Sequence, residues 1–216
     1  VYTFNNDEIR AINNKIAELY ADTKKVLKVI ALGDPSQLSA ELSPDFVSGL
    51  YTNFTIPLTT SYRTNVSAIS SYISKFQLSD VKVTGLVAQS NRSIDEAIND
   101  VNTTYGVVVS NQSDFDKLIN SPSKRTRVLI TNDTQIKQAY LGIPGVNVKL
   151  VHESQGYQWD EVYVNINEAL LPQDDFEANK VLYTAYSRSK SLLAIVGDSS
   201  LNNEPNEDLD SNLGHS

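Results

Sequence analysis

Short runs of apolar, mostly β-branched residues, separated by segments with helical spacing, constrain the fold of this chain most strongly. Five such runs occupy residues 26–32, 81–88, 105–111, 127–133 and 192–198. Strands of a parallel sheet are covered on both faces and therefore read as continuous apolar runs. The segments 6–25, 66–76 and 175–187 carry apolar residues at helical spacing. The alternation predicts an α/β fold with a parallel sheet and helices on both faces.

One stretch breaks the pattern with a polar turn. Residues 148–150 and 162–166 read as strands, and between them lies the sequence His-Glu-Ser-Gln-Gly, residues 152–156. Gly156 has no side chain to block a close backbone approach. Polar groups that follow a strand and end at a glycine commonly face a ligand. We therefore expect a binding site at this turn.

Composition excludes several kinds of site. The 216 residues are 40% hydrophobic and 20% charged, which is typical of a globular protein with a real core. Without cysteine, disulfides and thiolate metal sites are impossible, and two histidines cannot form a histidine-rich metal centre, so no metal site is expected. No apolar run has membrane-spanning length, and we expect no membrane association and a cytoplasmic location. The net charge of -8 argues against simple non-specific nucleic-acid binding but allows a local groove.

Four segments, in order, resemble the later motifs of superfamily 1 helicases. They are VIALGDPSQL (residues 29–38) for motif III, LTTSYRTN (58–65) for motif IV, VHESQGYQWDEV (151–162) for motif V and YTAYSRSKSLLAIVGD (183–198) for motif VI. The segment 127–133 also resembles a strand that these enzymes carry between motifs IV and V. The resemblance covers residues 1–200, and the His-Glu-Ser-Gln-Gly form is similar to viral and phage members. It implies a RecA-like fold.

The resemblance also implies a division of the chain. Residues 1–55 would be the C-terminal end of a first RecA-like domain, and residues 56–200 the second RecA-like domain. Residues 201–216 are acidic and poor in apolar residues, so we expect a disordered tail.

In the family, arginines of motifs IV and VI stabilise the charge of the transferred phosphate, because a guanidinium is a fixed and always charged donor. The resemblance assigns these catalytic roles to Arg63 and Arg188. It assigns the γ-phosphate contact and its coupling to movement to Gln37, supported by Gly33 and Asp34.

Motif V in the family touches both ligands. The resemblance places Gln155 and Gly156 near the nucleotide, and His152 and Glu153 near the nucleic-acid backbone. Thr131 and Asn132 are further candidates for a phosphate contact.

Plainer interpretations stay open beside these roles. Arg63 could be a surface arginine, Arg188 a solvated helix end, and the polar residues of the turn could simply close hydrogen bonds at a strand end. Two aromatic residues could stack on bases or belong to the core, and one basic cluster could contact phosphate or line a solvated loop: these are Tyr157 and Trp159, and Lys124, Arg125 and Arg127.

Two motifs of the family are absent from the sequence. No G-x-x-x-x-G-K-[ST] loop occurs, and no apolar strand ends in Asp-Glu. We expect that these motifs precede Val1 in a longer protein, that ATP and Mg²⁺ bind only together with that part, and that this chain alone does not hydrolyse ATP.

The resemblance therefore predicts the C-terminal portion of an ATP-dependent superfamily 1 DNA or RNA helicase. Its partners would be single-stranded DNA or RNA and the remainder of the helicase core, in the host cytoplasm if the source is viral. One alternative is a helicase-derived scaffold that binds nucleic acid or protein without ATPase activity. A more distant one is an unrelated nucleotide-binding α/β domain.

Overall fold

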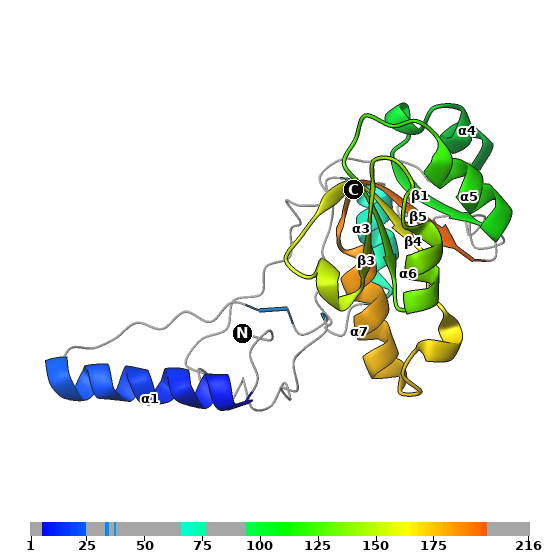
Figure 1. Cartoon of the computed structure of the whole chain (residues 1–216). Helices are drawn as coiled ribbons and strands as arrows, with labels where there is room; N and C mark the ends of the chain where they lie inside the picture. The colour runs from blue at the N-terminus through cyan, green and yellow to red at the C-terminus, as the bar shows by residue number, and fades with distance from the viewer. Residues whose placement is uncertain (1–5, 25–32, 35–36, 38–65, 77–93, 198–216) are drawn as a thin grey trace, which may run out of the picture.

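The computed structural model describes residues 6–24, 33–34, 37, 66–76 and 94–197 (Figure 1). Several predictions lie outside these ranges, namely the strands at 26–32 and 81–88, the domain boundary at 55/56, Arg63 and the acidic tail. The helices within them are α1 (Asn6–Thr23), α3 (Ser67–Ser74), α4 (Ile94–Asn99), α5 (Gln112–Asn120), α6 (Thr134–Tyr140) and α7 (Asp175–Tyr186). The 3-10 helices are η1 (Val101–Thr103), η2 (His152–Ser154) and η3 (Glu168–Leu170).

The strands in the described part of the chain form one parallel sheet. They are β1 (Gly106–Ser110), β2 (Arg127–Thr131), β3 (Val146–Leu150), β4 (Trp159–Val164) and β5 (Ser189–Val196), in the spatial order β1-β5-β4-β2-β3. Every neighbouring pair is parallel. The carboxyl ends of all five strands consequently lie at the same edge of the sheet, where open α/β sheets bind their ligands.

Helices cover both faces of this sheet. Successive side chains of a strand point to opposite faces, so each face has its own core cluster. Val107 and Val109 of β1 belong to a core cluster with Ile69 of α3 and Tyr183 of α7. Val108, between them in sequence, belongs to a second cluster that includes residues of α4 and α5. Figure 1 shows α3 and α7 on one side of the sheet and α5 on the other. The predicted fold, a RecA-like α/β arrangement, is confirmed.

Short polar side chains fix where the helices at the carboxyl edge begin. Asn111, directly after β1, accepts a hydrogen bond from the amide of Asp114 and caps α5. Asp133 caps α6 in the same way through the amide of Gln135. Asp174 accepts from two amides at the start of α7. Each cap satisfies an amide that has no partner within the helix.

Helix α1 matches the prediction for residues 6–25 but leaves most of its apolar face accessible. Ile9 is buried, whereas Ile12, Leu19 and Tyr20 are all exposed by more than a third. Within the described ranges, none of the helices combines the length and the apolar character that a bilayer crossing requires.

Candidate functional site

The carboxyl edge of the sheet holds the polar turn that follows β3. The amide of Val151 donates to the carbonyl of Thr131 at 3.0 Å, which holds the turn against the end of β2. The chain then enters η2, where Ser154 is fully buried and its hydroxyl donates to the Val151 carbonyl at 2.6 Å. The turn is therefore folded onto the sheet edge by its own backbone and by one buried serine.

Gly156 closes the turn, and its backbone conformation favours glycine. Its φ is +81°, in the left-handed region where a side chain is strained. A Cβ built on it would meet no protein atom within 4 Å, so the glycine faces open space. Glycine serves the conformation of the turn here, and the close approach of a ligand to its backbone stays a prediction.

Glu153 and His152 differ in their surroundings. The Glu153 carboxylate accepts two hydrogen bonds from Nζ of Lys137, at 2.7 and 2.9 Å, and one from the amide of Leu150 at 2.8 Å. The bonds from Lys137, then that from Leu150, lower the pKa of this carboxyl, and it stays ionised. His152, beside it, is exposed. Glu153 thus stabilises the turn, while His152 presents its ring to solvent.

A small pocket opens next to His152. It has a volume of about 190 Å³ and is lined by Asn132, Leu150, Val151, His152 and Val181. The pocket brings together two of the predicted nucleic-acid contacts, one after β2 and one after β3.

The two polar residues at the end of β2 have separate roles. Asn132 is half-buried and exchanges hydrogen bonds with the backbone of Asn167: its amide donates to the carbonyl at 3.0 Å and its oxygen accepts from the amide at 2.9 Å. Thr131 has no exposed surface, and its hydroxyl accepts from the amide of Asp133 at 3.1 Å. Asn132 lines the pocket, whereas Thr131 supports the start of α6.

Arg188 follows α7 and is 1% exposed. Its Nε donates to the carbonyl of Thr184 at 3.0 Å, Nη2 to the hydroxyl of Ser187 at 2.9 Å, and Nη1 to the carbonyl of Tyr157 at 3.4 Å. The last contact reaches the residue after Gly156, so the structure joins the segments that resemble motifs V and VI. The plainer interpretation of Arg188 as a solvated helix end is wrong.

Asp34 and Gln37 lie beside α7, far from it in sequence. Gln37 donates through Nε2 to Oδ2 of Asp34 at 3.2 Å, and through its amide to the Asp34 carbonyl at 3.2 Å. The Tyr183 hydroxyl donates to the same Oδ2 at 2.7 Å. The structure therefore brings the segment resembling motif III to the helix that leads to Arg188. Gly33, next to Asp34, is exposed, and Gln155, before Gly156, is half-buried.

Tyr183 is a residue that sequence reasoning missed. Its place within the segment resembling motif VI was visible, but no local spacing indicated a partner 149 residues away. The two aromatic residues of the turn have different surroundings. Trp159 is 7% exposed and belongs to the core. Tyr157 is 58% exposed, and Nζ of Lys149 lies 5.3 Å from the centroid of its ring.

Two arginines of the basic cluster before β2 donate to the backbone of the protein itself. Nη1 of Arg125 donates to the carbonyls of Thr104 and Val101 at 2.7 and 3.3 Å, and the guanidinium lies 4.4 Å from the centre of the Tyr105 ring. Arg127 donates to three further backbone carbonyls, those of Ile119, Ser121 and Pro144.

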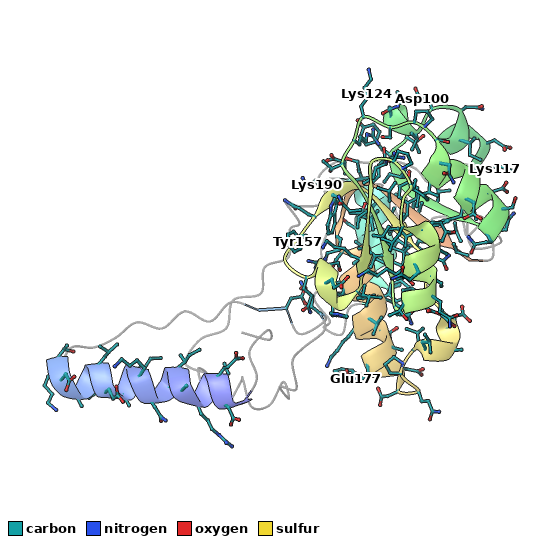
Figure 2. The ribbon with its side chains drawn as sticks, in the orientation of Figure 1. Asp100, Lys117, Lys124, Tyr157, Glu177 and Lys190 are labelled. Carbon is teal, nitrogen blue, oxygen red and sulfur yellow. The ribbon has the colours of Figure 1, made fainter. Side chains whose placement is uncertain are left out.

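Both arginines of this cluster lie at the amino edge of the sheet, opposite the turn. Figure 2 shows Lys124 projecting away from the domain, whereas Arg125 is half-buried and Arg127 is buried. For Arg125 and Arg127 the solvated loop is wrong, because their guanidinium groups donate to backbone carbonyls. The phosphate contact of the cluster stays a hypothesis. Among the residues that the structure describes, no group of three or more acidic or histidine side chains could hold a metal ion.

Comparison with known proteins gives a family match over most of the chain. The family described as the viral superfamily 1 RNA helicase core domain matches residues 7–197. A comparison with curated protein sequences gives no match. One solved structure that matches is the C-terminal domain of a possible DNA helicase from Lactobacillus plantarum WCFS1, at 21% identity, over 51% of this chain and 87% of that chain. Its TM-score is 0.34, and this likeness carries no part of the assignment.

Proposed function

The chain belongs to the viral superfamily 1 RNA helicase core family, and on this premise we propose that it is the C-terminal portion of a helicase driven by ATP. In this proposal the complete protein couples ATP hydrolysis to movement along single-stranded DNA or RNA and to unwinding. The chain supplies one side of the nucleotide site and part of the nucleic-acid path.

The observation that carries the proposal is the convergence of three segments that are distant in sequence. Asp34 accepts a hydrogen bond from Tyr183 of α7 and another from Gln37. Arg188, after the end of α7, contacts the residue that follows Gly156. A shared hydrogen-bond network among the segments that resemble motifs III, V and VI supports a common site, because those motifs act on one nucleotide in the family.

We propose that ATP and Mg²⁺ bind between this chain and the remainder of the helicase core. The sequence has no G-x-x-x-x-G-K-[ST] loop, so a phosphate-binding loop has to come from that remainder. When bound, ATP would supply the transferable phosphoryl group, with Mg²⁺ neutralising its charge.

Gln37 and Arg188 are the described residues proposed to face this phosphate, and Arg63 is the second arginine of the proposal. As it lies in the structure, the guanidinium of Arg188 is buried and donates to protein oxygens. A phosphate contact therefore requires Arg188 to exchange its bonds to Tyr157 and Ser187 for the ligand.

For nucleic acid we propose the surface around the pocket at the carboxyl edge. His152 is exposed there and Asn132 lines the same pocket. Backbone phosphates are the natural ligand of such donors, and their contacts position a strand without reading its sequence. Glu153, which is occupied by Lys137, would act by holding the turn rather than by touching the strand.

The decisive experiment uses the complete protein with its phosphate-binding loop. Arg188→Ala should lower nucleic-acid-stimulated ATP turnover by roughly 10³-fold, while a fluorescent ATP analogue still binds. Lys124→Ala, an exposed change outside the contacts of Arg188, is the matched control and should leave turnover within twofold. Near-normal turnover in Arg188→Ala would refute the assignment. The 216-residue chain alone should show no turnover.

One observation favours a second candidate function. The burial of Arg188 among carbonyl acceptors also suits a purely structural arginine in a helicase-derived scaffold that binds nucleic acid without hydrolysing ATP. In that case the complete protein would bind single-stranded DNA or RNA and show no turnover before any substitution is made.

A further inference from the structure

The carboxylate of Asp34 accepts two hydrogen bonds at one oxygen. Oδ2 lies 3.2 Å from Nε2 of Gln37 and 2.7 Å from the hydroxyl of Tyr183. The bond from Tyr183 ends on an ionisable acceptor, and bonds to ionised acceptors are shorter and stronger than neutral ones. Tyr183 itself is 6% exposed, so water competes little for this contact.

From Tyr183 the connection continues along α7. Thr184, the next residue, accepts through its carbonyl from Nε of Arg188 at 3.0 Å. Arg188 in turn reaches the carbonyl of Tyr157. A continuous series of contacts thus runs from Gln37 through Asp34 and the end of α7 to the turn after Gly156.

We propose that Tyr183 is a positioning residue that holds Gln37 and Arg188 in one geometry, with its hydroxyl acting through the carboxylate of Asp34. The inference rests on the proposed function, because Gln37 and Arg188 have phosphate-directed roles only in an ATP-driven helicase. It goes beyond it by assigning a positioning role to a tyrosine whose hydroxyl donates to Asp34.

The physical basis is that Gln37 and Arg188 must be held at a fixed position relative to each other to act on one phosphate. A side chain amide locates a phosphate only if its own position is fixed, and Asp34 fixes Gln37 through both its side chain and its backbone carbonyl. If the hydroxyl of Tyr183 is removed, Asp34 loses its bond to α7, and Gln37 is no longer oriented relative to Arg188. Misplacement of about 1 Å is enough to lower a rate by about 10²-fold.

The test compares Tyr183→Phe, Asp34→Ala and the double variant in the complete protein. Tyr183→Phe keeps the buried ring and removes only the donor. We expect it to lower kcat for ATP about tenfold or more, while KM for ATP stays within twofold, because positioning for the chemical step is lost and binding is kept. Asp34→Ala should lower kcat at least as much, and adding Tyr183→Phe to it should change kcat by less than twofold.

Tyr186→Phe is the matched control. It removes a tyrosine hydroxyl from the same helix, at a residue whose ring packs on Tyr72 and Phe76. Its kcat should stay within twofold of the unsubstituted protein. Thermal melting of all variants shows whether a loss of kcat comes from unfolding, and Asp34→Ala tests the same bond from its other side if Tyr183→Phe is unstable.

The outcomes separate the two proposals. Turnover that is unaffected by Tyr183→Phe, or losses that multiply in the double variant, would overturn the role of Tyr183 and leave the helicase proposal intact. Absence of turnover in the unsubstituted complete protein would refute the proposed function, and the role of Tyr183 would fall with it.

Discussion

Lys137 and Glu153 join helix α6 to the turn after β3, with Nζ of Lys137 lying 2.7 and 2.9 Å from the two carboxylate oxygens. The same carboxylate accepts the amide of Leu150 at 2.8 Å, where β3 ends. The pair is partly exposed, at 23% and 35% of the two side chains. It therefore fixes the turn that presents His152, at a modest gain in stability.

This pair predicts a specific pH dependence. The pKa of Glu153 is lowered in the folded state from its ordinary value of 4.5, chiefly by Lys137. Its stabilisation is thus fully present above about pH 4.5 and is lost as pH falls through the folded-state pKa. Glu153→Gln should be less stable than the unsubstituted chain at pH 7, by under about 1 kcal/mol, and the difference should shrink in acid. Urea unfolding at pH 3 to 7 measures it.

Glu168→Gln, an exposed change on η3, is the control for this series. It should leave the free energy of unfolding within about 0.5 kcal/mol of the unsubstituted chain at pH 7. A difference between Glu153→Gln and the unsubstituted chain that stays constant from pH 3 to 7 would contradict the ionic role of Glu153.

Gly156 leads to a prediction about backbone conformation alone. Because a Cβ would have open space there but φ is +81°, Gly156→Ala should cost only the left-handed strain, about 1–2 kcal/mol. Gly156→Asn should cost less, since asparagine tolerates this region better than other residues with side chains. Chemical denaturation of the three chains gives the order. Equal stability of the alanine and glycine chains would contradict a conformational role for Gly156.

Much of the sheet could be predicted from the sequence, because buried parallel strands consist of continuous apolar runs. The runs at 105–111, 127–133 and 192–198 contain or overlap β1, β2 and β5. Helix α7 likewise follows the predicted range 175–187 closely. In each case the pattern depends on residues that are neighbours along the chain.

The contacts of the candidate site could be predicted only in part, because they join residues that are far apart in sequence. Resemblance identified the segments of Asp34, Gly156 and Arg188, but nothing local indicated the bond between Tyr183 and Asp34. The burial of Thr131 could not be predicted from the sequence either, since a threonine at a strand end can face either solvent or the next helix.

Arg127 gives a prediction that separates structure from phosphate binding. It is 6% exposed and donates to three backbone carbonyls, which would lose their partner if the guanidinium were removed. Arg127→Met should lower the free energy of unfolding by about 2–3 kcal/mol, and the loss should persist in 0.5 M salt because the donors are buried. Lys124→Ala, nearby and exposed, should change it by less than about 0.5 kcal/mol.

The same pair of variants tests the nucleic-acid surface. At temperatures where both variants are folded, neither should change the affinity of the chain for single-stranded DNA or RNA by more than about twofold, because both residues lie at the amino edge. A selective loss of affinity in Arg127→Met, measured by fluorescence anisotropy, would instead support the phosphate role of this cluster.

Glu161 is the buried carboxyl of that amino edge. It has no exposed surface; the hydroxyl of Ser123 donates to Oε1 at 2.6 Å and that of Tyr163 to Oε2 at 3.0 Å. Arg125 lies 4.0 Å away. Burial outweighs these contacts and raises the pKa of Glu161 above 4.5.

A buried carboxyl with a raised pKa makes the protein less stable as pH rises. Well below pH 4.5 the carboxyl is protonated in both states and its ionisation has no effect on stability. Between pH 4.5 and the folded-state pKa the unfolded chain releases its proton first, so the free energy of unfolding falls with pH and then levels off.

The variant Glu161→Gln tests this pH dependence. Its side chain cannot ionise and should lack this fall, while all other titrating groups are shared by the two chains. The difference between their free energies of unfolding, measured in urea from pH 4 to 8, should therefore move in favour of the glutamine chain by about 1.4 kcal/mol for each unit between the two pKa values. A difference that is constant, or that moves in favour of glutamate, would show that Arg125 and the two hydroxyls outweigh burial.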